Sequence, residues 1–242
     1  MLLLAGMVAL AAGGPGEELV WGVRVAGINA GQAGARTVAG PGSDLFIETW
    51  LKNADWYGSI YSVDDTTRST WSVEGGSTRY ETRFREGGFH QDQDMRLDPD
   101  GFQVWRRQKV KEGWREWTTP YAAEPYVEDP VTAIFALREA SGDGPWSMPV
   151  FSGKNTWPLN ATLIGRETLE GTTLGTVDVI VLSLQTRHRG EWEQQGRFLV
   201  YYTDDAQRIP VRMVIRSSIG AIRVDLVGYT PPQNRPAQDP SP

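Results

Sequence analysis

The sequence contains no cysteine, and its 242 residues include only two histidines. The lack of cysteine excludes thiol nucleophiles, disulfides, cysteine-ligated zinc, iron–sulfur clusters and covalent haem attachment. Basic residues are not in excess either, because the formal net charge is -6 and the isoelectric point is near 5.1. A nucleic-acid-binding protein would carry a basic face, and adsorption to anionic lipid would need one. We expect neither behaviour.

Long hydrophobic runs are also absent. The N-terminal run, "MLLLAGMVALAAGG", is shorter than the roughly 20 apolar residues of a membrane-spanning helix. It ends in small residues, and Ala9-Leu10-Ala11 fits the A-x-A pattern of a cleavage site. We therefore expect residues 1–14 to be a signal peptide and the chain to have no transmembrane segment. The protein is expected to be periplasmic or secreted, and soluble after cleavage.

Strand signals dominate the rest of the chain. Runs rich in Val, Ile, Thr, Tyr and Trp alternate with Gly- and Asp-containing turns at intervals of about 8–12 residues, which predicts an antiparallel meander. The expected strands are 18–28, 44–53, 66–74, 77–88, 102–110, 160–169, 177–186, 197–202, 209–218 and 221–229. The expected fold is mainly β, a strongly curved antiparallel sheet or open barrel with one short helix packed against it.

The single helix is expected at residues 130–140. Asp129 can cap its first turn, Pro130 suits the first helical position, and Gly142 can end it. The stretch "VDVIVLSL" (177–184) is apolar on both faces, so it is either a central strand covered on both sides or a strand whose second face lines a hydrophobic cavity.

One β-rich domain is expected over residues 16–229. The remaining residues, 230–242, are rich in proline and polar side chains, a composition typical of a disordered tail.

Two acidic pairs are candidates for acid–base chemistry or for turns. Asp204 and Asp205 precede Arg208 in "YYTDDAQRIPV", and we expect a hairpin turn because Asp accepts hydrogen bonds from nearby backbone N–H groups. Arg208 is then expected within reach of Asp204 across the turn. Pro210 then needs a bulge or a free sheet edge. Asp64 and Asp65 are interpreted in the same way, as a turn or strand-entry pair that Arg68 could meet.

A weak metal candidate lies in "FHQDQDM". On a strand, His90, Asp92 and Asp94 would project from one face, and an imidazole with two carboxylates can ligate a divalent ion. This would suit a metal-assisted hydrolase. Arg96 and Asp98 continue the same row, which favours cross-strand ion pairs instead. With no G-x-S-x-G motif, we expect no catalytic residue, no cofactor and no enzymatic activity.

Aromatic and basic residues are interleaved in "VWRRQKVKEGWREWTTPY". This composition suits contact with an envelope glycan, a lipid headgroup or another protein, and the alternative is cross-strand pairing in a hairpin that turns at Gly113. The candidate ligand or partner site comprises Trp105, Arg107, Trp114, Trp117 and Tyr121.

Several stretches together resemble a Gram-negative envelope family catalogued as domain of unknown function 3108. They are "GEELVWGVRVAGINAG" (16–31), "YSVDD" (61–65), "FREGGF" (84–89), "DPVTAIFALR" (129–138), "MPVFSGK" (148–154), "GTVDVIV" (175–181), "YTDDAQRIPVR" (202–212) and "IGAIRVDL" (219–226). The resemblance implies an exported β-rich protein without a recognised activity.

The leading functional hypothesis is therefore a non-catalytic periplasmic binding or carrier protein for an apolar or amphipathic envelope component. The alternative is a structural or assembly partner in the cell envelope. A cavity of roughly 300 Å³ or more between helix and sheet would favour the first hypothesis.

Overall fold

The structure is a computed structural model that describes residues 13–58, 61–72, 75–98, 101–122, 124, 126–140, 142–188, 191–192, 198–217 and 220–233. Most of the expected signal peptide (1–12) and of the expected Pro-rich tail (234–242) lies outside the described residues. The described residues include 13–14 and 230–233 of these two ranges. Thr37 donates a hydrogen bond to the carbonyl of Gly14, and the backbone N–H of Gln233 donates to the carbonyl of Pro15.

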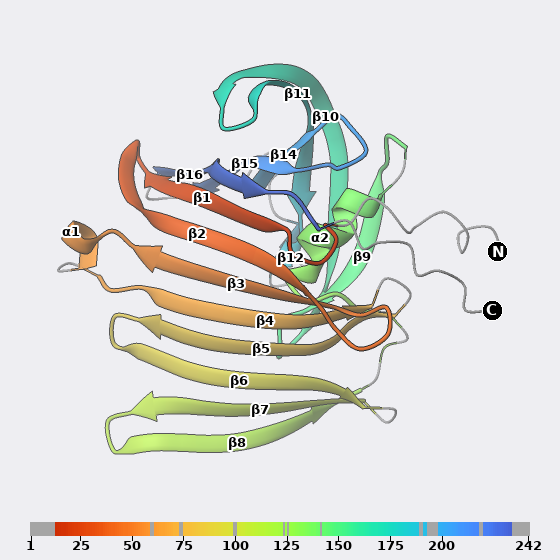
Figure 1. Ribbon diagram of the computed structural model, residues 1–242. Coiled ribbons are helices and arrows are strands. Elements are labelled where there is room, and N and C mark those ends of the chain that lie inside the picture. Colours follow the sequence, from red (N-terminus) through yellow and green to blue (C-terminus); the bar gives the residue numbers. More distant parts are fainter. Residues whose placement is uncertain are drawn as a thin grey trace.

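One antiparallel sheet of 14 strands makes up most of the fold (Figure 1). Its first half comprises β1 (Glu18–Val25), β2 (Ile28–Ala39), β3 (Leu45–Asn53), β4 (Asp64–Ser72), β5 (Gly76–Glu86), β6 (Phe89–Asp98), β7 (Gly101–Val110) and β8 (Gly113–Tyr121). Its second half comprises β9 (Trp146–Phe151), β10 (Thr156–Thr172), β11 (Gly175–Gln185), β14 (Phe198–Thr203), β15 (Pro210–Ser217) and β16 (Gly220–Thr230).

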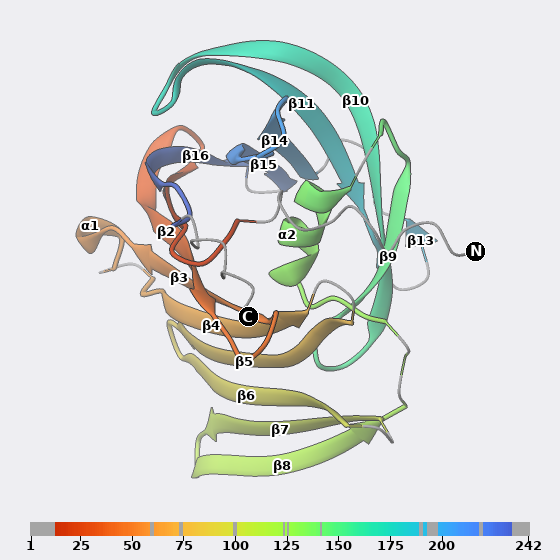
Figure 2. The same ribbon diagram turned by 45° about the vertical axis from the view of Figure 1, so that its right-hand side comes forward.

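The order of the strands is β8-β7-β6-β5-β4-β3-β2-β1-β16-β15-β14-β11-β10-β9, so β1 pairs with β16 in the middle and the sheet is not closed. Figure 2 shows it curling around α2 (Thr132–Glu139), with β6 to β8 extending away from the curled part. A short α1 (Asp55–Gly58) lies between β3 and β4, and β12 (Arg187–His188) pairs with β13 (Glu191–Trp192) in a separate ribbon. The predicted fold class is confirmed.

The helix α2 begins with the capping arrangement that the sequence predicted. The Asp129 carboxylate accepts hydrogen bonds from the backbone N–H groups of Val131 and Thr132, at 2.7 and 3.0 Å. These two donors have no partner inside the helix, so the cap stabilises its first turn. The helix then buries Phe135 and Leu137 against the inner face of the sheet, which contributes roughly 1.5–3 kcal/mol for each side chain.

The strand β11 is buried on both faces over residues 179–184, which agrees with its two-sided apolar pattern. Ile180 and Leu182 pack in one cluster with Leu137 of α2, whereas Val179 belongs to a second cluster that includes Leu169 of β10. The β10–β11 hairpin arches across β14 and β16 in Figure 2, and Thr173 near its tip donates to a carbonyl of β16. Of the two predicted alternatives, the covered central strand is therefore the correct one.

A short segment ties the two halves of the sheet together. Val127 forms a parallel bridge with Gly76 at the start of β5, and Glu128 forms one with Val150 in β9. The ring of Phe151 stacks on Phe102 with centroids 4.7 Å apart. The segment leading into α2 thus joins β5 to β9 and holds the curled part of the sheet around the helix.

Candidate functional site

A cavity of about 620 Å³ lies between α2 and the inner face of the curled sheet. Its walls come from β1 to β5, β15, β16 and one side of α2, and they are mostly apolar. The polar members are Thr49, Lys52, Asn53, Asp65 and Thr67. The lining side chains include Trp21, Ala33, Leu51, Tyr61, Asp65 and Ile134. The volume falls in the range of small-molecule binding sites, which is about 300–1,000 Å³.

The cavity is hollow because one of its walls is built from small residues. The strand β2 reads "INAGQAGARTVA", and both Ala33 and Ala35 face inward, opposite Trp21 and Leu19 of β1. On the outer face, a Cβ at Gly34 would come 2.4 Å from the ring of Trp50, so only glycine fits beneath that ring. Large inward side chains on β2 would fill the space that the helix leaves open.

The cavity reaches solvent at the end of the sheet that carries α1. Leu51 and Tyr61 line the cavity, and they are 37% and 43% exposed. Asp65 is buried at the same end, where its carboxylate accepts a hydrogen bond from the backbone N–H of Arg85. Burial and a hydrogen bond with the Asp65 carboxyl raise the pKa of Glu86. This opening, which we call the mouth of the cavity, therefore combines aromatic and aliphatic groups with the acidic pair Asp65 and Glu86.

The predicted aromatic site is divided between the two faces of the sheet. Trp105, Arg107 and Trp114 share the outer face, and the guanidinium of Arg107 lies 4.6 Å from the centroid of the Trp114 ring. Trp117 and Tyr121 project from the inner face, where Tyr121 packs edge-on against Phe151. The five residues therefore do not form one binding site.

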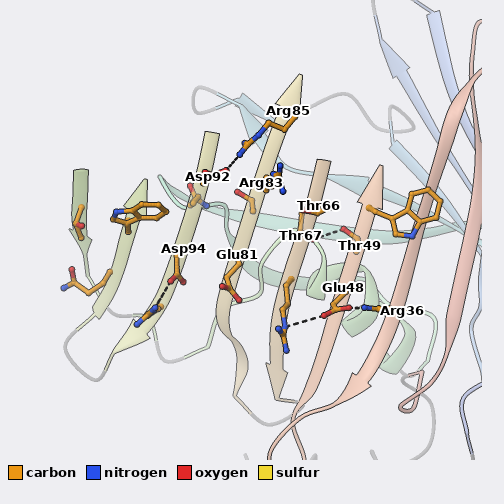
Figure 3. A pocket seen from close by; sticks show the side chains of 18 of the residues that line it. Arg36, Glu48, Thr49, Thr66, Thr67, Glu81, Arg83, Arg85, Asp92 and Asp94 are labelled. Atoms are coloured by element: carbon orange, nitrogen blue, oxygen red, sulfur yellow. Dashed lines mark hydrogen bonds and ion pairs between the residues drawn. The ribbon is translucent and has the colours of Figure 1, made fainter. Parts of the chain in front are cut away.

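A second hollow of about 1090 Å³ lies on the outer face of the first eight strands (Figure 3). It is lined by charged side chains that pair with one another across neighbouring strands. Arg36 pairs with Glu48 at 2.5 Å, and Arg85 pairs with Asp92 at 2.5 Å. These pairs satisfy the charges on a partly exposed surface, which is the arrangement of a solvated sheet face.

The metal candidate belongs to this charged face. The Asp92 carboxylate pairs with Arg85, and that of Asp94 pairs with Arg79 and Arg96 at 3.0 and 2.8 Å. Burial opposes the charge on Asp94, but the two arginines hold its pKa below the ordinary value. Among the residues that the structure describes, no three His, Asp or Glu side chains are grouped as metal ligands. His90 is thus not joined by free carboxylates.

The two acidic pairs occupy turns and strand ends. Asp205 accepts hydrogen bonds from the backbone N–H groups of Gln207 and Arg208, and Arg208 has a positive φ of 46°. Asp204 pairs with Arg166 rather than with the expected Arg208. The β14–β15 register shifts beside Pro210, as its missing N–H requires.

At the start of β4, Asp64 lies 3.7 Å from Lys52. Arg68, the expected partner of this pair, contacts Glu48 instead.

Buried charges surround α2 but lie apart from the cavity. Arg138 forms a bidentate pair with Glu17 at 2.7 and 2.8 Å, and both side chains are 1% exposed. Glu128 and Asp129 are also fully buried, and burial raises the pKa of both carboxyls. Trp71 and Tyr126 donate hydrogen bonds to Glu128. These groups fix the helix and the segment before it.

Comparison with known proteins identifies the family. Residues 18–227 match the family described as "Protein of unknown function (DUF3108)". The chain belongs to this family. No curated protein matches. Among solved structures, the chain is similar to a β-barrel-like protein of the domain of unknown function DUF1849 from Brucella abortus. The TM-score is 0.61 at 8% sequence identity, over 92% of this chain and 99% of the other, so the likeness concerns the fold alone.

No helix among the described parts of this DUF3108 protein combines the length and the hydrophobicity that a membrane span requires.

Apart from Asp65, the residues that line the cavity are not among the candidate sites that the sequence predicts. The sequence pattern that indicates the cavity is the alternation of alanine and glycine in β2, because residues this small leave space beside the strand.

Proposed function

We propose that this DUF3108 protein binds and carries an apolar or amphipathic component of the cell envelope, without catalysis, in the periplasm. The observation that carries the proposal is the cavity of about 620 Å³ between α2 and the sheet. One water molecule takes up about 30 Å³ in the liquid, so the cavity has room for about 20 groups of that size. This is the scale of one acyl chain.

The inner cavity suits a ligand better than the larger outer hollow does. Transfer of an apolar ligand into the inner cavity removes apolar surface from water on both partners, at roughly 25 cal/mol for each Å². The outer hollow offers paired arginines and carboxylates, which would have to lose their water and their partners. The acidic pair at the mouth favours a ligand whose polar end is uncharged or cationic.

Native mass spectrometry of protein purified from its own periplasm tests the proposal. The expected result is an added mass that organic extraction releases, together with uptake of the uncharged probe N-phenylnaphthylamine by the extracted protein. An unliganded mass combined with no uptake of the probe would refute the proposal.

A further inference from the structure

Exposed apolar side chains gather at one end of the molecule. The described residues expose ten large apolar side chains, and seven of them lie at the end of the sheet that carries α1. One of the seven, Trp114, lies on the outer face beside Arg107. The other six are Ile28, Leu51, Trp56, Tyr61, Phe89 and Val110, and we call them the mouth rim. Single exposed apolar residues are common on protein surfaces, but a one-sided set marks an interaction site.

The topology explains why these residues meet. In an antiparallel meander, alternate turns fall at the same end of the sheet, and Figure 1 shows the β1–β2, β5–β6 and β7–β8 turns on the same side as α1. Ile28 directly follows the first of these turns, and Phe89 follows the second. Trp56 lies in α1, is 50% exposed, and donates from its indole N–H to the Asn29 carbonyl, which fixes the ring beside Ile28.

The mouth rim is continuous with the cavity. Leu51 and Tyr61 belong to both, since they line the cavity and are also more than a third exposed. An apolar ligand that enters or leaves the cavity must therefore pass the rim. Such a ligand is concentrated in lipid bilayers, and release through water would expose it at the full hydrophobic cost.

The chemistry of the rim fits the interface of a bilayer. Tryptophan and tyrosine are favoured there because one part of each ring is apolar and the other part forms hydrogen bonds. Lys109 and Lys111 flank Val110 in the sequence, at the end of β7 and in the turn that follows it. The whole chain is acidic, so apolar contact rather than net charge must supply the attraction.

We propose that the mouth rim docks on the surface of a lipid bilayer, so that an apolar ligand moves between bilayer and cavity without crossing water. This inference rests on the proposed function, because docking serves exchange only if the cavity holds a ligand. The partner is the bilayer itself. The vesicles used below contain no protein, so a rim that contacts only a protein would give no signal with them.

The cysteine-free chain allows single labels to be placed at will. Ile28 and Val38 are exposed apolar residues at opposite ends of β2, 60% and 41% exposed, so Ile28→Cys and Val38→Cys form a matched pair. Each would carry an environment-sensitive fluorophore and meet vesicles of palmitoyl-oleoyl phosphatidylcholine. We expect a blue shift at position 28 and none at position 38. Equal shifts, or none at either position, would overturn the proposal.

Sedimentation with the same vesicles gives an independent readout. The double variant Ile28→Ser/Phe89→Ser should lower the vesicle partition coefficient at least about tenfold, whereas the control Val38→Ser/Val227→Ser should leave it within about twofold. Equal losses in both variants would contradict docking through the rim.

Uptake of N-phenylnaphthylamine from solution separates this inference from the proposed function. The rim variant should still take up the probe, because the cavity walls are intact. If vesicle contact fails while uptake persists in the wild type, the docking proposal falls and the binding proposal stands. If the wild type contacts vesicles but takes up no probe, the cavity holds no ligand for the rim to exchange. The docking proposal and the proposed function would then both be refuted.

Discussion

Filling the cavity from its alanine wall should weaken binding and stabilise the fold at the same time. Ala33 lies opposite Trp21 in the β1–β2 register and lines the cavity. Ala33→Leu adds three carbon atoms to the space that a ligand would occupy. At about 0.8 kcal/mol for each buried methylene, the loss of three ligand methylenes costs about 2.4 kcal/mol, or roughly 60-fold in Kd. The same atoms reduce an apolar void, which commonly adds about 0.5–2 kcal/mol of stability.

The assay is titration with N-phenylnaphthylamine alongside urea unfolding of the ligand-free protein. The matched control is Ala39→Leu, the same change at the exposed end of the same strand, which lies outside the cavity. The control should bind as the wild type does. An Ala33→Leu variant with unchanged affinity and unchanged stability would refute the account of the cavity, and lower stability would show that the space is already filled.

Three further predictions concern the charges that hold the fold. Burial raises the pKa of Glu128 above its unfolded value, so its contribution to stability is present at acid pH and is lost as the pH rises through the raised pKa. In Glu128→Gln, the free energy of unfolding measured with urea should fall less between about pH 4.5 and about pH 8 than it does in the wild type. The same pH dependence in both proteins would contradict the reasoning. Arg138→Met leaves Glu17 buried and unpaired, which should cost about 3–5 kcal/mol in urea unfolding, while adding Glu17→Leu should recover most of it. An unaltered midpoint in the single variant would be inconsistent with the buried pair. Asp205→Ala should cost about 1–2 kcal/mol in thermal unfolding because two backbone donors lose their acceptor, whereas Asp204→Ala should cost less than about 0.5 kcal/mol; similar values would argue against the turn geometry.

Local chemistry made several features predictable from the sequence. The cap at Asp129 depends on side chains and backbone groups within three residues, so its pattern is visible without the fold. The two-sided apolar pattern of β11 likewise predicted a strand with no solvent-exposed face. The turn at Asp205 followed from the same local rule, because its acceptors and donors are neighbours in the chain.

Long-range features were not predictable in the same way. β2 was missed because alanine and glycine have low strand propensity, and its strand form depends on pairing with β1 and β3 along its length. The partner of Asp204 is 38 residues away, so the expected local pair with Arg208 was wrong.

The division of the aromatic segment could have been inferred from periodicity alone. Trp114 and Trp117 are three positions apart on one strand, and side chains at odd spacing project to opposite faces. The composition of the segment suggested a single surface, whereas the strand geometry places its residues on two.

The central claim is that the space between α2 and the sheet accepts an apolar molecule. Crystals of the protein grown with a brominated long-chain alcohol would test it most directly, because the anomalous signal of bromine locates the chain. The account predicts a bromine peak inside the cavity, between Ile134 of α2 and Trp21 of β1. Bromine found only on the outer face of the sheet, with the cavity empty or closed, would contradict it.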